Sequence, residues 1–203
     1  LQGEKNILNF NDLSKENIYV LDSPILSNSQ FEKFKDYFKE NYKIIECTFN
    51  KEDTLKVALD RIRSSAEIAA REGIKQIILT DKIIDENTLA IPMVLAVGAV
   101  NSHLIQKSLR GFISLNVQTG DVLDTHSYAT LLGVGATTIN PYLALDTICQ
   151  RFEKNLFGKF DIEDCIKRYI KSVDNGLLKI MSKMGISVLS SYRGGCNFET
   201  VGL

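Results

Sequence analysis

Apolar residues recur along the chain with a spacing that switches between that of strands and that of helices from residue 43 onward. Lys43 to Phe49 has the alternation of a strand, and Asp53 to Glu72 has apolar residues at helical spacing along one face. Gly73 follows at the position where a helix commonly ends on a left-handed residue. Gln76 to Thr80 is short and solidly apolar, which is typical of a strand buried on both faces of a parallel sheet. The pattern therefore predicts a strand, a helix and a second strand in succession.

The same alternation continues through the rest of the chain. Further helices are predicted over Pro92–Leu109, His126–Leu132, Tyr142–Phe152 and Asp161–Met184. Further strands are predicted over Phe112–Val117, Ala136–Ile139 and Ile186–Leu189. Asp161 is a suitable N-cap for the last long helix, and Gly185 follows its expected end.

The N-terminal part has a different character. Residues 1–20 are polar and mixed, and we interpret them as a tail or linker that ends in a short extended run, Tyr19 to Leu21. Ser27 and Gln30 have the spacing of a capping box, in which each side chain satisfies a backbone amide at the start of a helix. The aromatic residues that follow at helical spacing are Phe31, Phe34, Tyr37 and Phe38. A helix with an aromatic inner face is therefore predicted after residue 27.

Strands and helices that alternate through connections of a few residues indicate an α/β fold with a mainly parallel sheet. An open doubly wound sheet and a rudimentary or incomplete TIM-type barrel both fit this order. Five or six strands are predicted, whereas a closed barrel of this type has eight, so the strand count does not separate the two. We treat residues 21–203 as one domain.

Charge and hydropathy exclude several classes of function. The 203 residues include 24 Lys and Arg against 25 Asp and Glu, so no overall field attracts the chain to nucleic acid or to an anionic membrane. The longest apolar run, Ile91 to Val100, is too short to span a bilayer. The N-terminus has no export signal and does not begin with Met, so we expect a processed or excised cytoplasmic chain.

The four cysteines are far apart in the sequence. They are Cys47, Cys149, Cys165 and Cys196, and none forms a C-x-x-C pair. A chain of this length can build a core without cross-links, so we expect four free thiols in a reducing compartment.

Candidate functional residues lie where predicted strands end, because the sites of parallel α/β folds gather there. Asp81 follows one strand, and Asn140 and Tyr142 follow another. Asp81 could act as a general base or hold a ligand hydroxyl, but we favour a role as a loop cap. Tyr142 could equally begin a helix and pack inward.

Two further side chains stand outside this group. His126 follows Asp124, a spacing that can orient an imidazole, but no serine or cysteine stands in the context of a nucleophile elbow. His103 and His126 are the only histidines, so a catalytic zinc site with three protein ligands is not predicted. Arg193, followed by two glycines, could bind an anion or belong to a loop that packs on a following domain.

Gly133 to Thr138 resembles a phosphate-binding loop in composition but not in position. Such loops follow a strand and open a helix, whereas here the predicted helix precedes the glycines and the strand follows them. The third glycine of the dinucleotide fingerprint is also missing. We therefore expect these glycines to end a helix and turn the chain.

Several long strings in the chain are unusual enough to compare with known families. They are residues 21–26 (LDSPIL), 91–100 (IPMVLAVGAV) followed by His103 and Leu104, 131–144 (LLGVGATTINPYLA), and 175–187 (NGLLKIMSKMGIS) continued by Ser191–Gly194, Phe198–Glu199 and Val201–Leu203. In this order they resemble the central domain of glutamate synthase large subunits, over roughly residues 21 to 203.

The resemblance implies a multidomain enzyme that makes glutamate from glutamine and 2-oxoglutarate. An N-terminal amidotransferase domain with a catalytic first cysteine would release ammonia into an internal channel toward an FMN-binding synthase domain, which also carries an iron–sulfur cluster. The central domain would join these two partner domains of the same polypeptide and resemble a rudimentary form of the synthase barrel. Residues from about 186 to 203 would lead toward the synthase domain.

None of the residues that hold flavin, 2-oxoglutarate or the iron–sulfur cluster in the family can be placed on this chain. We therefore expect a scaffold that catalyses nothing alone, contains no cofactor and does not bind flavin mononucleotide tightly. The alternative is a stand-alone flavin- or anion-binding α/β barrel enzyme with its site at the strand ends. A scaffold should leave apolar surface exposed, and we expect this around Asn140–Tyr142 and from Tyr192 to Leu203, where Phe198 and Val201 lack a helical stripe to bury them.

Overall fold

The computed structural model of the protein describes residues 19–199 and residue 201. The predicted N-terminal tail lies almost completely outside the described residues. The short extended run predicted at Tyr19 to Leu21 forms no strand.

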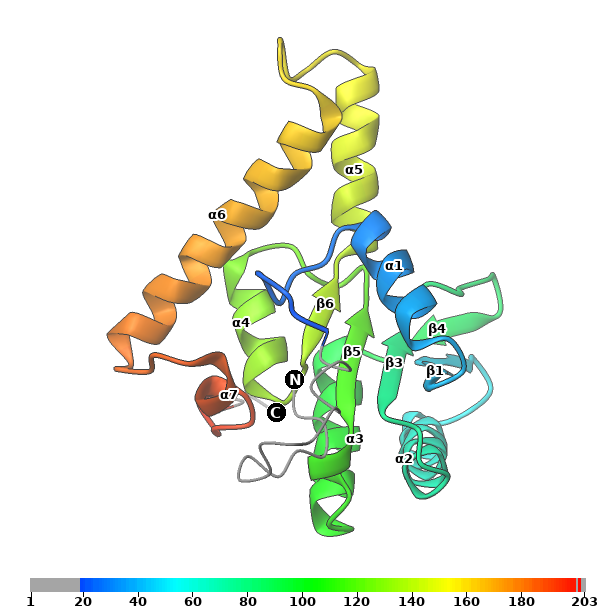
Figure 1. The fold of residues 1–203 in the computed structure, drawn as a ribbon. Coiled ribbons are helices and arrows are strands. Elements are labelled where there is room, and N and C mark those ends of the chain that lie inside the picture. Colours follow the sequence, from blue (N-terminus) through cyan, green and yellow to red (C-terminus); the bar gives the residue numbers. More distant parts are fainter. Residues whose placement is uncertain (1–18, 200, 202–203) are drawn as a thin grey trace.

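Strands and helices alternate through most of the described chain (Figure 1). The strands are β1 (Tyr42–Glu46), β2 (Thr48–Asn50), β3 (Gln76–Thr80), β4 (Thr88–Ala90), β5 (Ser114–Gln118) and β6 (Thr138–Asn140). The helices are α1 (Asn28–Phe38), α2 (Leu55–Arg71), α3 (Met93–Gln106), the 3-10 helix η2 (Arg110–Phe112), α4 (Thr125–Gly133), α5 (Tyr142–Glu153), α6 (Ile162–Lys183) and α7 (Leu189–Tyr192).

Four strands form a parallel sheet in the order β1-β3-β5-β6, which confirms the predicted fold class. The edge of β6 that faces away from β5 pairs with no named strand, but Ile25 forms a single parallel bridge there with Ile139. Leu26 N donates to Ile139 O, and Ile139 N donates to Pro24 O, each at 2.8 Å. β2 and β4 form a separate antiparallel pair. The arrangement is that of an incomplete barrel, with four parallel strands where a closed barrel has eight.

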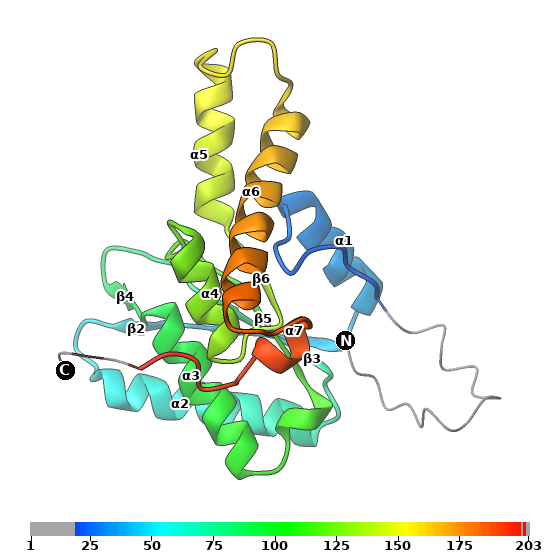
Figure 2. The same cartoon turned by 90° about the vertical axis from the view of Figure 1, so that its left-hand side faces the viewer.

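The sheet is the middle layer of the molecule, with helices on both faces (Figures 1 and 2). On one face, Ile77 and Leu115 belong to the main core, which α2, α3 and α4 cover. On the other face, Ile78 packs with Phe31 and Phe34 of α1. Side chains of a strand alternate between faces, so one apolar strand supplies both cores. This explains why the three central residues of β3, Ile77 to Leu79, are all apolar.

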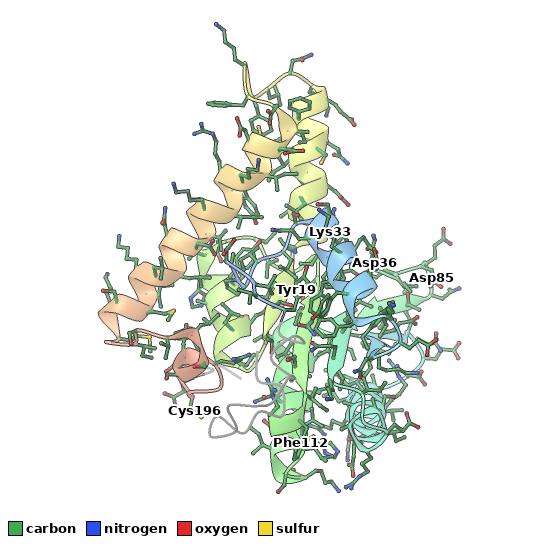
Figure 3. All side chains as sticks on the ribbon, in the orientation of Figure 1. Tyr19, Lys33, Asp36, Asp85, Phe112 and Cys196 are labelled. Atoms are coloured by element: carbon green, nitrogen blue, oxygen red, sulfur yellow. The ribbon has the colours of Figure 1, made fainter. Side chains whose placement is uncertain are left out.

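Helices α5 and α6 run antiparallel and project beyond the sheet in both views (Figures 1 and 2). Buried residues of α6 lie only in its second half, at Val173, Leu177 and Met181. Nearer the tip, the guanidinium of Arg168 lies 4.3 Å from the centroid of the Phe160 ring. Many side chains of the hairpin extend away from the body (Figure 3). The tip is therefore held mainly by contacts within the hairpin itself.

Local signals for helix ends are confirmed. Ser27 N donates to Gln30 Oε1 at 2.9 Å and Gln30 N donates to Ser27 Oγ at 3.2 Å, which completes the predicted capping box. Asp161 accepts from Asp164 N at 2.7 Å at the start of α6. Gly73 and Gly185 adopt φ of +86° and +70°, the left-handed conformation expected after a helix.

Four predicted strands need correction. The strand predicted over Phe112–Val117 begins only at Ser114, because Phe112 ends the 3-10 helix η2. The strand predicted from Lys43 to Phe49 divides at Cys47 into β1 and β2, which belong to different sheets. The strand predicted over Ala136–Ile139 begins only at Thr138. The strand predicted over Ile186–Leu189 is wrong: the chain there is irregular and then enters α7. The open edge of the sheet that it could have joined is occupied by Pro24 to Leu26. β4 was not predicted.

The cysteines are all free thiols, and they range from buried Cys47 to exposed Cys196 (Figure 3). Burial, followed by the nearby charge of Asp81, raises the pKa of Cys47 to about 12. No helix among the described residues is long and apolar enough to cross a membrane.

Candidate functional site

A polar cluster lies at the carboxyl ends of the parallel strands, where the sequence predicted a site. It consists of Asp81 after β3, Thr119 and Gly120 after β5, and Tyr142 at the start of α5; we call it the strand-end cluster. Asp81 is 2% exposed, and its carboxylate accepts from the Thr119 hydroxyl and from Gly120 N at 3.1 and 3.2 Å. It also accepts a hydrogen bond from the Tyr142 hydroxyl. Asp81 therefore ties three loops together.

Burial raises the pKa values of two ionisable groups in this cluster. Burial raises the pKa of Asp81, although the hydrogen bonds from Thr119 and Gly120 oppose the shift. Burial and the Asp81 carboxylate together raise the pKa of the Tyr142 phenol to about 12. The Lys82 ammonium lies 5.7 Å from the centroid of the Tyr142 ring. Asp81 thus holds the loop after β5 rather than the segment that follows it in the chain, and its acceptor capacity is used within the chain.

Below the strand-end cluster, side-chain amides form a ladder across the sheet. Thr80 Oγ1 donates to Gln118 Oε1 at 3.1 Å, and Gln118 Nε2 donates to Asn140 Oδ1 at 3.2 Å. Asn140 Nδ2 donates to Leu26 O and Asn28 Oδ1, each at 3.0 Å. The ladder joins three strands to the start of α1 and contains no titratable side chain.

A second row of the same kind lies one step further along the strands. Asn116, fully buried, donates to Gln76 Oε1 at 3.0 Å and accepts from Thr138 Oγ1 at 2.8 Å. Sequence reasoning missed both rows. The available signal was the alternation of polar residues in β5, at positions 114, 116 and 118, where a doubly buried strand is normally apolar throughout.

The five candidate residues do not form one site. Asp81, Asn140 and Tyr142 gather at the carboxyl ends of the strands, as expected. His126 is exposed in the first turn of α4, and its ring centroid lies 5.6 Å from that of Phe198. Arg193 lies beside Thr137, just before β6 begins, and Arg193 Nη1 donates to Thr137 Oγ1 at 3.0 Å.

The glycine segment between α4 and β6 does not present free amides. Val134, Gly135 and Ala136 donate their N–H groups to carbonyls of α4 at 2.9 to 3.1 Å. Gly135 has φ of +126°, and a Cβ there would lie 2.5 Å from the Asn101 side chain. The segment ends a helix and turns the chain as predicted, and the amides that a flavin phosphate would need are already engaged.

The expected exposed apolar surface is present only in part. Asn140 is buried and Tyr142 is half-buried, so the prediction at that point was wrong. At the same edge of the sheet, however, four apolar side chains of the loops and of α5 are exposed: Ile83, Ile84, Leu123 and Leu143. In the terminal stretch Tyr192 is buried, whereas Phe198 is 36% and Val201 is 88% exposed. Leu203 lies outside the described residues.

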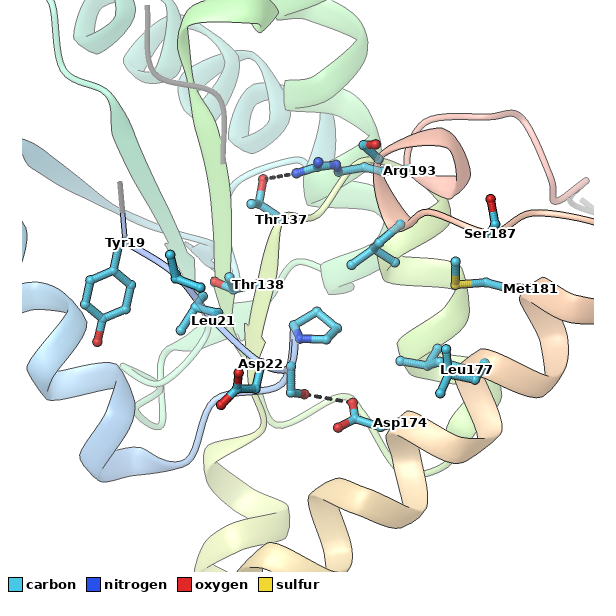
Figure 4. A pocket seen from close by; sticks show the side chains of 16 residues that line it. Tyr19, Leu21, Asp22, Thr137, Thr138, Asp174, Leu177, Met181, Ser187 and Arg193 are labelled. Atoms are coloured by element: carbon cyan, nitrogen blue, oxygen red, sulfur yellow. Dashed lines mark hydrogen bonds between the residues drawn. The ribbon is translucent and has the colours of Figure 1, made fainter. Parts of the chain in front are cut away.

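A cavity of about 600 Å³ lies away from the strand-end cluster (Figure 4). Its walls are residues 19–24, the start of β6, the second half of α6, and the chain from Ser187 to Arg193. At one end Ser23 Oγ donates to Asp174 Oδ1 at 2.7 Å, and burial raises the pKa of Asp174. At the other end is the pair formed by Arg193 and Thr137. No sequence pattern predicts this cavity, because its walls come from segments about 150 residues apart.

Metal ligands are not grouped in the part of the chain that the structure describes. No three side chains among its His, Cys, Asp and Glu residues are placed to hold an ion. Instead, His103 Nε2 lies 2.7 Å from Glu67 Oε2. His103 thus packs against a side chain of α2.

The fold is similar to that of known flavocytochromes. A mutant flavocytochrome b2 with benzoylformate superposes with a TM-score of 0.52 at 14% identity, over 86% of this chain and 41% of that protein. A second mutant flavocytochrome b2, with pyruvate bound, gives a TM-score of 0.51 at 15% identity, over 86% of this chain and 40% of that protein. At this identity the likeness supports the incomplete-barrel fold and nothing further.

Sequence relatives are much closer. The chain is 48% identical over 201 residues to the glutamate synthase [NADPH] large chain of Azospirillum brasilense, and 40% identical over 183 residues to that of Bacillus subtilis (strain 168). It is 40% identical over 200 residues to the chloroplastic ferredoxin-dependent glutamate synthase of Spinacia oleracea. These matches cover 98%, 89% and 91% of this chain but only 12 to 13% of each relative. The family model described as glutamate synthase central domain matches residues 1–203, and the chain belongs to that family.

Proposed function

We propose that this domain is the central scaffold of a glutamate synthase large subunit, linking a glutamine amidotransferase domain to an FMN-binding synthase domain. The parent enzyme would be a cytoplasmic oxidoreductase that makes glutamate from glutamine and 2-oxoglutarate. The observation that carries the proposal is the family match over the whole chain, in a chain that spans about an eighth of its relatives. The domain would fix the separation and orientation of two active sites and could form part of the wall of the ammonia path.

The chemistry of the strand-end cluster supports a structural role. Asp81 accepts hydrogen bonds from Thr119, Gly120 and Tyr142, and the neighbouring amides pair with one another. A general base needs an acceptor that can reach substrate, and here the acceptors are turned inward to hold loops. This also argues against the alternative of a stand-alone barrel enzyme with its site at the strand ends.

We place the cofactors of the parent enzyme outside this domain. FMN carries a phosphate, and the glycine segment before β6 has its amides engaged by α4. An iron–sulfur cluster needs several cysteine ligands close together, whereas the four cysteines here are spread over the sequence and differ widely in burial. The residues present therefore do not fit either group.

The exposed apolar side chains at the strand-end edge are where we expect a neighbouring domain to pack. Ile83, Ile84 and Leu143 are 58%, 54% and 50% exposed, and Leu123 is 86% exposed. Lone domains seldom expose contiguous apolar patches, which commonly mark interfaces. Two loops and the start of α5 supply these residues, so a single partner surface could cover them.

The test uses the full-length protein with Leu123→Asp, which places a charge where a partner should pack. Glutamine-dependent glutamate formation should fall by roughly tenfold or more, because a misplaced domain separates the two reactions, while ammonia release from glutamine persists. Lys56→Asp, on the exposed side of α2, is the matched control and should leave both rates unchanged. Full coupled activity in Leu123→Asp, or glutamate formation by the 203-residue chain alone, would contradict the proposal.

A further inference from the structure

Two guanidinium groups flank the connection between α4 and β6. Arg110, in η2, donates to Gly135 O at 2.8 Å, to Asn101 Oδ1 at 2.6 Å and to Ile113 O. Arg193, beyond α7, donates to Thr137 Oγ1 at 3.0 Å from the other side of the same connection. Residues 83 positions apart are therefore brought together at one place.

Neither arginine has an acidic partner within the described residues. All recorded acceptors of Arg110 are neutral oxygens, and Arg193 has the single acceptor Thr137 Oγ1. That hydroxyl already accepts from Leu115 N at 3.2 Å. A guanidinium has five N–H donors, so most of those on Arg193 remain available.

The two positive charges also lie in a partly desolvated place. Burial, and next the charge of Arg193, lower the pKa of Arg110 to about 10. Burial likewise lowers the pKa of Arg193. Buried charges in proteins are normally paired, because an unpaired one is costly to remove from water. A pair of like charges without a counter-ion is therefore an incomplete site.

The cavity beside Arg193 indicates what completes it. Arg193 and Thr137 lie at one end of the 600 Å³ space, and Leu177, Met181 and Leu189 form much of its wall (Figure 4). Asp174, at the opposite end, is engaged by Ser23 and forms no ion pair with Arg193. The cavity thus has a cationic end at Arg193, an apolar wall beside it, and the carboxylates of Asp22 and Asp174 at the far end.

We propose that Arg193, supported by Arg110, binds a carboxylate group carried on an apolar stem. The planar fork of a guanidinium matches a carboxylate in a bidentate manner, and the apolar wall receives the stem. The carboxylate comes from a small free acid or from an acidic side chain of another segment of the same protein. This site is distinct from the strand-end edge and does not depend on the proposed scaffold function.

The first arm of the test measures a free acid. Full-length protein is titrated calorimetrically with hexanoate at constant ionic strength, with hexanamide as the uncharged analogue. Hexanoate should bind, hexanamide should bind at least about tenfold more weakly, and Arg193→Gln should weaken hexanoate binding by about tenfold or more. Arg193→Lys keeps the charge without the fork and should be intermediate. Lys179→Gln, which removes an exposed charge from α6, should have no effect.

The second arm detects an internal carboxylate. If an acidic side chain already occupies the site, hexanoate will not bind, and a structure of the full-length protein will show that carboxylate within about 4 Å of the Arg193 guanidinium. Arg193→Glu should then lower the melting temperature. Combining it with replacement of that acidic residue by Arg, which exchanges the two charges, should restore the melting temperature. Absence of hexanoate binding together with a solvent-filled site in that structure would overturn the proposal, as would equal binding of hexanoate by wild type and Arg193→Gln.

Discussion

Asp81 shows how a single buried carboxylate can stabilise a fold without taking part in chemistry. It is 2% exposed and receives hydrogen bonds from the Thr119 hydroxyl, Gly120 N and the Tyr142 hydroxyl. These three donors belong to segments that follow two different strands. The fixed geometry of the strand-end edge therefore depends on one side chain, whose ionisation is opposed by burial.

The raised pKa of Asp81 predicts a pH-dependent contribution to stability. The folded chain binds this proton more tightly than the unfolded chain does, so the contribution is largest below the usual pKa of 3.8 and declines as pH rises through the raised value. In Asp81→Asn this decline disappears. Urea unfolding of both proteins across mildly acidic pH should show the wild-type-minus-variant difference falling as pH rises, with a slope of at most about 1.4 kcal/mol per pH unit.

The control for this measurement is Asp36→Asn, on the exposed face of α1 (Figure 3). Its profile should follow that of the wild type. A difference between wild type and Asp81→Asn that rises with pH would mean that the hydrogen bonds outweigh burial and would reverse the assigned direction.

Sequence reasoning at the scale of single residues succeeds where the signal is local. Ser27 with Gln30, and Asp161 with Asp164, lie three positions apart, so the sequence alone specifies the contact. Asn140 was singled out for its place after a strand, but its partners Leu26 and Asn28 are more than 110 positions away. Arg110 was not singled out at all, because only folding brings it next to Arg193 and the glycine segment.

Packing between α4 and α6 depends on a glycine in the middle of a long helix. A Cβ on Gly176 would lie 2.5 Å from Thr125 Cγ2 and 2.8 Å from Thr125 Oγ1. Real Cβ atoms do not approach so closely, so the missing side chain allows α6 to cross α4. Glycine weakens an isolated helix by about 1 kcal/mol relative to alanine, and close approach outweighs that loss here.

Gly176→Ala should therefore lower the free energy of unfolding by about 1–2 kcal/mol, because overpacking outweighs the gain in helix propensity. Thr125→Ala removes the two closest atoms, so in that background the cost of Gly176→Ala should shrink by about 1 kcal/mol or more. Urea unfolding of the four proteins of this cycle gives the coupling.

Gly98→Ala is the matched control, since it lies inside α3 with no atom within 4 Å of a built Cβ. It should raise the free energy of unfolding by about 1 kcal/mol. If Gly176→Ala stabilises the protein as Gly98→Ala does, the packing of α6 on α4 does not require a glycine at position 176.

Long periodic elements were the best predicted of all, and short ones the worst. The helices α2, α3, α5 and α6 lie within a few residues of their predicted bounds, because each has many turns of consistent spacing. The pattern over residues 186–189, which were predicted as a strand, is too short to distinguish a strand from a helix. The edge of β6 that a strand there could have joined is paired with Pro24 to Leu26.

At the scale of the whole molecule, the chain resembles part of a barrel in which helices cover both faces of the sheet. Four parallel strands are covered by α2, α3 and α4 on one face, and α1 lies on the other with Phe31 and Phe34 packed on Ile78. The known structures of similar fold are flavocytochromes, and this chain covers about two-fifths of each. Alternating strands and helices predicted the parallel sheet, but not which helix would cover which face, because that depends on contacts between distant segments.

This architecture predicts that the 203-residue chain does not bind flavin mononucleotide tightly. A flavin site on a barrel needs an open end with free polar groups, and here the strand-end donors and acceptors are paired with one another. A phosphate needs free backbone amides, and those of Val134 to Ala136 are used by α4.

Fluorescence titration of the chain with flavin mononucleotide should show no saturable change up to high micromolar concentrations. The full-length protein serves as the positive control and should be yellow when purified. Submicromolar binding by the chain, which corresponds to more than about 8 kcal/mol, would return the flavin site to this domain and with it the case for an independent barrel enzyme.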